Sequence, residues 1–170
     1  MWFGTKDGLC RYDGISCKVY CNDPDNPGSL GSNYVHSLYE DRDNNLWVGT
    51  DDGLYIYDRR KDVFRKFDRK TPDGRSIDRL VQCIVPDEEG NILIGVYWAG
   101  MFRYDPRTEE LSVVSYTDGS SSGLSSNGIW KIHADSNNIV WIATVGGGLN
   151  RYDMRTGEIR FFYTPDRLSN

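Results

Sequence analysis

One pattern recurs four times along the chain. Each copy begins with tryptophan or aliphatic residues, continues through a glycine-containing polar stretch and ends in Tyr-Asp. The copies are Trp2–Asp13, Leu46–Asp58, Leu93–Asp105 and Val140–Asp153. Their Tyr-Asp pairs lie 45, 47 and 48 residues apart. A period of this length indicates a repeat architecture, in which each unit buries its apolar surface against its neighbours.

Within one period the sequence predicts four short strands. Val35–Tyr39 is followed by a polar turn at 41–45 and then by Leu46–Thr50. A glycine-centred turn leads to Leu54–Tyr57, and the last unit shows the fourth strand at Ile159–Tyr163. Apolar residues do not recur at helical spacing. Sheets of four antiparallel strands that repeat every 40–50 residues or so are typical of β-propeller blades.

The predicted fold is therefore all-β, a β-propeller fragment of about four blades of four antiparallel strands. The first blade lacks its innermost strand, and the blades are expected at 1–22, 33–70, 79–117 and 127–164. Stacked blades with open ends would expose two broad apolar faces. We expect either an excerpt of a longer propeller, or two copies that pair head to tail into a ring of about eight blades.

The residues of the repeat suit blades that stack face to face. Large side chains of the second strand are expected to fill the space between blades: Trp2, Trp47, Leu93 and Trp141. Glycines are expected where the next turn requires a positive φ: Gly8, Gly53, Gly100 and Gly148. Small residues that let sheets approach are Gly4, Gly49, Gly95 and Ala143. Each Tyr-Asp pair is interpreted as a packed ring followed by a turn carboxylate.

Composition excludes several classes of protein. The chain is 38% hydrophobic and 13% aromatic, which is typical of a globular protein. A net charge of −5 argues against nucleic-acid binding, which needs a concentrated basic face. No apolar run approaches the roughly 18 residues of a membrane span, and residues 1–4 do not resemble a signal peptide. We therefore expect no membrane contact in this segment.

The four cysteines leave two interpretations open. None forms a Cys-x-x-Cys pair, and no histidine lies at ligand spacing, which argues against zinc. Cys10 and Cys17 flank a turn at Asp13-Gly14. With a two-residue loop there, the two thiols lie opposite each other, and a disulfide is conceivable in an oxidising compartment. Free thiols of the kind found in cores are the favoured interpretation.

Signals for catalysis or for a cofactor are weak. His36 and His133 fall at non-equivalent places in their strands, and neither has a Ser or Cys partner at motif spacing. The segment 41–45 resembles a calcium loop, but Leu46 stands where such a loop requires glycine. The Gly146–Gly148 run lies between strands rather than before a helix. No enzyme, metal or cofactor is predicted.

The repeat resembles the two-component regulator propeller repeat. The match is carried by Asp-x-x-x-Asn-Leu-Trp-Val-Gly-Thr-x-x-Gly-Leu-x-x-Tyr-Asp, read from Asp41 to Asp58. A Ser-Asn pair before the first strand adds to it, as at Ser32-Asn33 and Ser126-Asn127. The third unit departs from the pattern at 94–99, and the fourth has Ala143 in place of glycine. The motif describes a scaffold and assigns no functional residue.

The resemblance implies a location and a role. Such repeats resemble those of the periplasmic sensor halves of hybrid two-component systems in Bacteroides-like gut bacteria. There, tandem propellers precede an immunoglobulin-like domain, a membrane span, a histidine kinase and response-regulator modules. The family senses glycan breakdown products and controls polysaccharide-utilisation genes. The implied partners are an oligosaccharide or other small-molecule ligand, and further blades of the same protein or a second copy.

A ligand would be expected at the rim formed by the loops that enter each innermost strand and by the turns between strands two and three. Tyr97 and Trp98 place two aromatic residues where the other units have small or charged ones, and sugars stack well on flat aromatic faces. A hydrophobic plug or a contact between chains is the alternative. The further candidates on this rim or near the central channel are Asn33, Asp78, Arg79, Asn127 and Trp130.

The leading hypothesis is an extracytoplasmic sensor fragment that binds a carbohydrate-derived ligand and signals to a kinase. One alternative is an interaction scaffold, or a truncated propeller without a sensing role. A second alternative is a propeller lyase, which would need a rim histidine with acidic partners around a metal.

Overall fold

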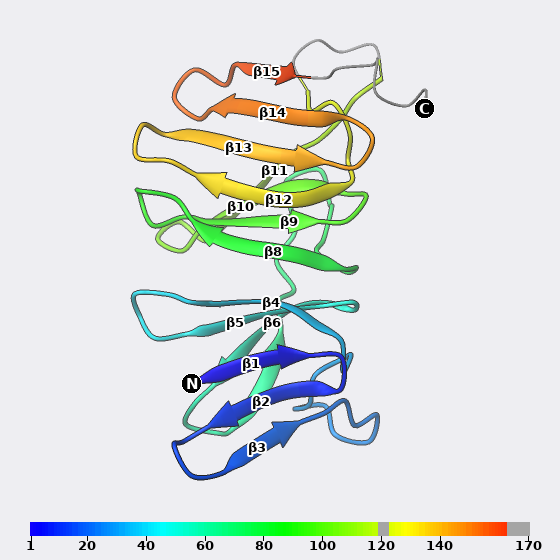
Figure 1. Cartoon of the computed structure of the whole chain (residues 1–170), viewed down its shortest axis with the longest axis vertical. Helices are drawn as coiled ribbons and strands as arrows, with labels where there is room; N and C mark the ends of the chain where they lie inside the picture. Colours follow the sequence, from blue (N-terminus) through cyan, green and yellow to red (C-terminus); the bar gives the residue numbers. More distant parts are fainter. Residues whose placement is uncertain (119–122, 163–170) are drawn as a thin grey trace, which may run out of the picture. The chain divides into compact units, whose positions relative to one another are not determined.

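The computed structural model describes residues 1–118 and 123–162. Within these ranges every regular element is a β-strand, and fifteen strands form four antiparallel sheets (Figure 1). No helix in the described ranges is long and apolar enough to cross a membrane. The predicted all-β class is confirmed.

Strands adjacent in sequence are also adjacent in each sheet. The first sheet contains β1 (Trp2–Thr5), β2 (Gly8–Tyr12) and β3 (Cys17–Tyr20). The second contains β4 (Val35–Glu40), β5 (Leu46–Thr50), β6 (Gly53–Asp58) and β7 (Val63–Lys66). The third contains β8 (Val81–Pro86), β9 (Ile92–Val96), β10 (Gly100–Asp105) and β11 (Glu110–Val114). The fourth contains β12 (Ile129–Ala134), β13 (Ile139–Thr144), β14 (Gly148–Asp153) and β15 (Ile159–Phe162).

These sheets are propeller blades, and the first has three strands, as the repeat predicts. The predicted fourth strand of the last unit ends at Phe162, and Tyr163 lies outside the described residues. The chain divides into two compact units, Met1–Ile84 and Val85–Asn170. We describe each unit by itself.

In the first unit the first and second sheets pack through an aromatic cluster. The ring of Trp2 lies 5.0 Å from that of Tyr57 and 5.8 Å from that of Tyr20. Gly4 makes this packing possible, because a Cβ there would lie 2.7 Å from Cγ1 of Val35 in β4. For Trp2 and Gly4, the predicted roles between blades are confirmed.

A carboxylate closes the exposed edge of this cluster. Asp62, in the β6–β7 turn, accepts hydrogen bonds from the hydroxyls of Tyr57 at 2.5 Å and Tyr20 at 2.7 Å. It also pairs with the Lys18 ammonium. The bond from Lys18 and those from the two hydroxyls hold the pKa of Asp62 well below its usual range. Burial, together with the bond to Asp62, raises the pKa of Tyr57. A polar network therefore joins β3 of one sheet to the outer turn of the next.

Turn carboxylates end the strands as the repeat predicts. Asp58 accepts hydrogen bonds from the backbone N–H groups of Arg60 and Lys61, while Tyr57 beside it is 2% exposed. Asp41 accepts bonds from two backbone N–H groups of its own turn and from the indole N–H of Trp47 at 2.8 Å. Hydrogen-bond donors of the protein thus occupy the Asp41 carboxylate in segment 41–45, the segment that resembles a calcium loop, as expected of a turn.

The interpretation of the cysteines as free thiols is wrong for one pair. Cys10 and Cys17 form a disulfide across β2 and β3, with their Cα atoms 6.0 Å apart. The expected register is also wrong, because Cys17 lies opposite Tyr12 and Cys10 opposite Val19. The loop has four residues, 13–16, rather than two, since Asp13 accepts bonds from the N–H groups of Ile15 and Ser16. The bridge is therefore diagonal.

Breaking this bridge should destabilise the first sheet. We expect Cys10→Ala combined with Cys17→Ala to lower the free energy of unfolding by about 2–3 kcal/mol, because the closed loop is short. Urea denaturation measures the difference. Cys21→Ala, at an exposed free thiol, is the control. Equal stability of the double variant and the parent chain would show that the bridge contributes nothing.

Candidate functional site

The second unit contains a shallow hollow of about 290 Å³ at one end of its sheets. Three segments form it: the β9–β10 turn, the stretch between β11 and β12, and the β13–β14 turn. All three belong to the rim where the sequence predicts a ligand. The lining residues are Trp98, Tyr116, Ser125, Ser126, Asn127, Val145 and Gly146.

Longer turns help to shape the hollow. Val96 pairs with Gly100 and Thr144 with Gly148, each pair enclosing three residues. The corresponding turn of the first unit joins Thr50 to Gly53 and encloses two. The extra residue in the β9–β10 turn accompanies a left-handed backbone at Trp98, whose φ is 58°. Positive φ is uncommon for a large residue and often marks a functional position.

Trp98 is the most exposed aromatic residue of the hollow. Its side chain is 54% exposed, and its ring meets that of half-buried Tyr97 edge-on at 5.5 Å. Tyr116 is 43% exposed and donates its hydroxyl hydrogen bond to Asp118 at 3.1 Å. The bond to that carboxylate raises the pKa of Tyr116. The hollow thus presents two aromatic rings, with a carboxylate held at the hydroxyl of one of them.

Asn127 fixes the position of the loop that carries Tyr116. Its side-chain oxygen accepts a hydrogen bond from the Tyr116 N–H at 2.7 Å, and its carbonyl accepts one from Gly100 at 3.2 Å. Asn33 does the same in the first unit. Its side-chain oxygen accepts a hydrogen bond from the Asn22 N–H at 2.6 Å, and its carbonyl accepts one from the Gly8 N–H at 2.8 Å. Both asparagines therefore have a structural role that the sequence analysis missed.

The serines of the hollow also serve the scaffold. Ser125 Oγ lies 3.1 Å from Thr144 Oγ1 and accepts a bond from buried Asn150 at 2.8 Å. Ser126 Oγ accepts a bond from the Gly128 N–H at 3.2 Å. None of the residues that line the hollow carries a charge.

The other predicted site residues do not line the hollow. Asp78 and Arg79 belong to the first unit, where they form an exposed ion pair with a 3.5 Å separation. Trp130 lies on β12, is 59% exposed and occupies a β-bulge. Among the seven predicted residues, the structure places Trp98 and Asn127 in the lining of one hollow. Tyr116 was not predicted, although the departures of both turns from the repeat point to this part of the rim.

His36 is paired with a carboxylate and stacked on an aromatic ring. His36 Nε2 lies 2.6 Å from Asp51 Oδ1, and the His36 ring stacks on Tyr34 at 4.2 Å. His36 is thus in a strand, as predicted, yet its partner belongs to a rim turn. Over residues 1–118 and 123–162 no three His, Cys, Asp or Glu side chains gather as metal ligands would.

Two segments match a family model, that of the two-component regulator propeller, at residues 29–52 and 123–146. Each segment spans the loop with the anchoring asparagine, the innermost strand, the second strand and the start of the next turn. These two stretches of the chain are two-component regulator propeller repeats. No curated protein matches the chain.

Solved structures similar to this chain include extracellular domains of putative hybrid two-component systems. The extracellular domain of a putative hybrid two-component system from B. thetaiotaomicron aligns with a TM-score of 0.81 at 21% identity, over 96% of this chain and 23% of that one. A second such domain from the same organism gives a TM-score of 0.81 at 23% identity, over 95% and 23%. The chain thus spans about a quarter of these relatives.

Virginiamycin B lyase from Staphylococcus aureus is a more distant match. It aligns with a TM-score of 0.66 at 14% identity, over 98% of this chain and 52% of that one. At this identity the likeness concerns the fold alone, and it assigns no lyase residues to the propeller repeats described here.

Removing the asparagine anchor should loosen the rim. We expect Asn127→Ala to lower the free energy of unfolding by about 1 kcal/mol, because the Tyr116 N–H loses its hydrogen-bond acceptor. Hydrogen exchange should show faster exchange at Tyr116. Asn137→Ala, at an exposed position in the β12–β13 turn, is the control. Unchanged exchange at Tyr116 would show that Asn127 does not anchor this loop.

Proposed function

We propose that the chain is part of an extracytoplasmic sensor propeller of a hybrid two-component regulator. In this proposal it binds a glycan-derived oligosaccharide and passes a signal to a histidine kinase elsewhere in the protein. The observation that carries the proposal is the exposed Trp98 beside an uncharged hollow, at the turn that departs from the repeat.

The chemistry of the hollow supports an oligosaccharide. The C–H faces of a sugar ring pack on flat aromatic side chains, while its hydroxyls bind amides and hydroxyls nearby. Trp98 and Tyr116 offer aromatic surface, and Ser126 and Asn127 offer polar atoms. An open hollow suits an extended chain of sugars better than a small enclosed metabolite.

Two observations support a location outside the cytoplasm. The Cys10–Cys17 disulfide is of the kind that persists in oxidising compartments such as the periplasm. The similar B. thetaiotaomicron structures are described as extracellular domains. A periplasmic sensor half of a two-component regulator agrees with both.

The principal alternative is an interaction scaffold, in which Trp98 would be covered by another protein. An enzymatic role has less support, because the hollow is lined by no titratable side chain except the Tyr116 hydroxyl. General acid–base catalysis requires a group within hydrogen-bond reach of the substrate.

Loss of the Trp98 ring should weaken ligand binding. We expect Trp98→Ala to reduce affinity for the oligosaccharide that binds best in a glycan screen by about three- to tenfold, as expected of one lost stacking contact. Titration calorimetry measures it. Phe3→Ala removes a 46% exposed ring of the first unit and is the control. Absence of any binding glycan would favour the scaffold.

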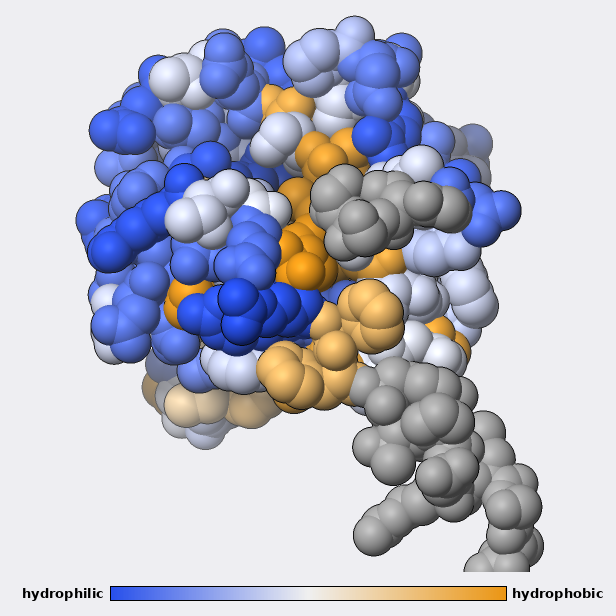
Figure 2. Space-filling model, turned by 90° about the horizontal axis from the view of Figure 1, so that it is seen from above, coloured by the Kyte–Doolittle hydropathy of each residue, from blue (hydrophilic) through white to orange (hydrophobic). Residues whose placement is uncertain are grey.

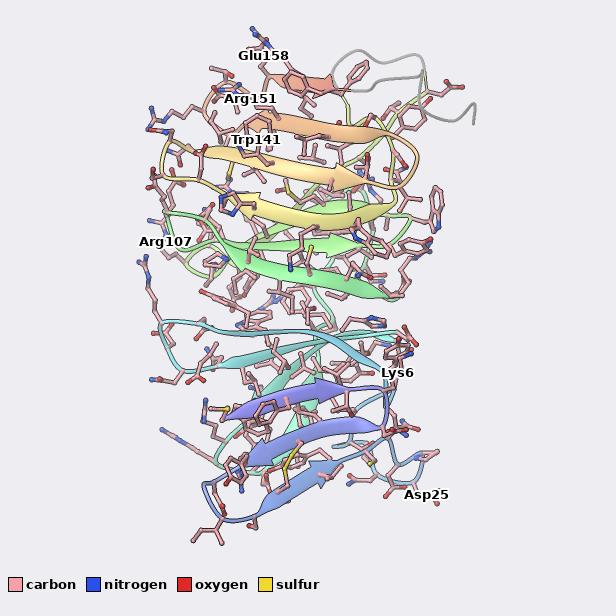
Figure 3. The ribbon with its side chains drawn as sticks, viewed as in Figure 1. Lys6, Asp25, Arg107, Trp141, Arg151 and Glu158 are labelled. Atoms are coloured by element: carbon pink, nitrogen blue, oxygen red, sulfur yellow. A yellow bond between two sulfur atoms is a disulfide. The ribbon has the colours of Figure 1, made fainter. Side chains whose placement is uncertain are left out.

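We also propose that other blades cover two exposed faces. On the first sheet, Phe3, Tyr12 and Val19 are 46%, 39% and 56% exposed. On the fourth sheet, Leu149 and Phe162 are 38% and 53% exposed. Seen from above, from the side on which β15 lies in Figure 1, the molecule shows hydrophobic side chains in the middle of a largely hydrophilic surface (Figure 2). Trp141 lies on this second face opposite Arg151 (Figure 3), and its ring is 6.1 Å from that of Phe162.

The first unit supports blades as the occupants. Trp2, Leu9 and Tyr20 hold the positions of Trp141, Leu149 and Phe162 in the register, and they are covered by the second sheet. The covering blades would be those of the same protein or of a second copy.

The chain by itself should therefore associate. We expect light scattering coupled to size-exclusion chromatography to give a dimer or a larger species, because the two faces are apolar. Leu149→Glu should shift the distribution toward monomer, while Glu158→Gln, at an exposed turn, should not. A well-folded monomer of the parent chain would contradict this part of the proposal.

A further inference from the structure

The first unit carries its own aromatic ring at the rim. The phenol ring of Tyr34, just before β4, stacks on the imidazole of His36 with centroids 4.2 Å apart and planes 28° apart. The ammonium of Lys6 (Figure 3), in the β1–β2 turn, lies 5.3 Å from the centroid of the same ring. Tyr34 thus occupies a ring-sized place bounded by residues of two sheets.

Backbone hydrogen bonds identify the same place in the second unit. Asp51 N–H donates to the Tyr34 carbonyl at 3.3 Å, and Val145 N–H donates to the Gly128 carbonyl at 2.7 Å. These bonds join the same two elements of each repeat, the residue before the innermost strand and the turn after the second strand. Gly128 therefore corresponds to Tyr34.

Two further correspondences define the walls of this place. A β-bulge interrupts β4 between Val35 and Ser37, at His36, and another interrupts β12 between Ile129 and Lys131, at Trp130. A bulge redirects a side chain relative to its strand. Trp130 therefore corresponds to His36. Lys6 precedes Gly8 by two residues and Trp98 precedes Gly100 by two, and each glycine donates to the anchoring asparagine.

At the corresponding positions the second unit therefore has Trp130 where the first has His36, and Trp98 where the first has Lys6. It has Gly128 where the first has the ring of Tyr34. We propose that a sugar ring of the ligand binds in the second unit at the place that corresponds to the Tyr34 ring of the first unit. It stacks on Trp130 beside Trp98, and Gly128 keeps the place open. This inference rests on the proposed function and adds Trp130 and Gly128 to the binding site.

The charges around the hollow define the class of sugar. The lining residues are uncharged, and the Asp118 carboxylate is held at the hydroxyl of Tyr116. A carboxylate or sulfate on the ligand would meet no positive partner among the lining residues and a like charge nearby. The ligand ring is therefore a neutral pyranose rather than a uronic acid or a sulfated sugar.

Filling the place with a side chain tests the inference. We expect Gly128→Tyr to weaken binding of a neutral oligosaccharide by about tenfold or more, or about 1.4 kcal/mol and above. Gly128→Ala is the matched control, because a Cβ at 128 lies 3.0 Å from Val145 Cβ in either variant. Only the tyrosine adds a ring at the proposed sugar position, so the alanine variant should bind as the parent does.

A second pair of variants tests the stacking partner. We expect Trp130→His, which introduces the residue of the first unit, to weaken binding by about three- to tenfold. Tyr34→Gly, in the first unit, should leave affinity unchanged. Calorimetry with neutral oligosaccharides and with their uronic-acid counterparts supplies both comparisons, and circular dichroism checks that each variant is folded.

The outcomes separate this inference from the proposal beneath it. If no oligosaccharide binds the parent chain, the proposed function is wrong and this inference fails with it. If a neutral oligosaccharide binds and Trp98→Ala weakens it, while Gly128→Tyr and Trp130→His bind as the parent does, only this inference is overturned. Tighter binding of the acidic ligand would likewise overturn the assignment to a neutral sugar.

Discussion

A four-stranded sheet in this chain cannot bury both of its faces alone, and the packing of one sheet on another is the constraint on which the structure depends. It explains why small residues recur in the second strand, where Gly4 leaves room for Val35. It also explains why Tyr57 is buried under Trp2. Where no sheet of the described residues covers these positions, as at Leu149 and Phe162, the side chains are exposed.

Polar chemistry in the scaffold is concentrated at the ends of strands. Asp41, Asp58 and Asp62 each accept several hydrogen bonds, and each is held by donors from turns or from a neighbouring sheet. Carboxylates with so many protein donors have little capacity left for a ligand. In the second unit, Asp135 and Asp153 likewise accept backbone hydrogen bonds around their own turns. The rim loops of that unit, by contrast, expose the rings of Trp98 and Tyr116.

The fold could be predicted from the sequence because the period, the turn glycines and the Tyr-Asp pairs all reflect local geometry. The same reasoning failed for Cys10 and Cys17, since the length of the loop between them depends on the Asp13 side chain rather than on the Asp-Gly pair. It singled out Trp98, which lines the hollow, because that residue departs from the repeat. It missed Tyr116, because a loop brings this residue to the hollow and no periodic pattern describes a loop.

Asn33 and Asn127 have a consequence for how such proteins diversify. Each fastens the end of a rim loop by two hydrogen bonds, one through its side chain and one through its backbone. Residues between the fastened points can then be replaced or inserted without disturbing the register of the strands on either side. A rim built in this way tolerates changes in loop sequence and length at a small cost to folding.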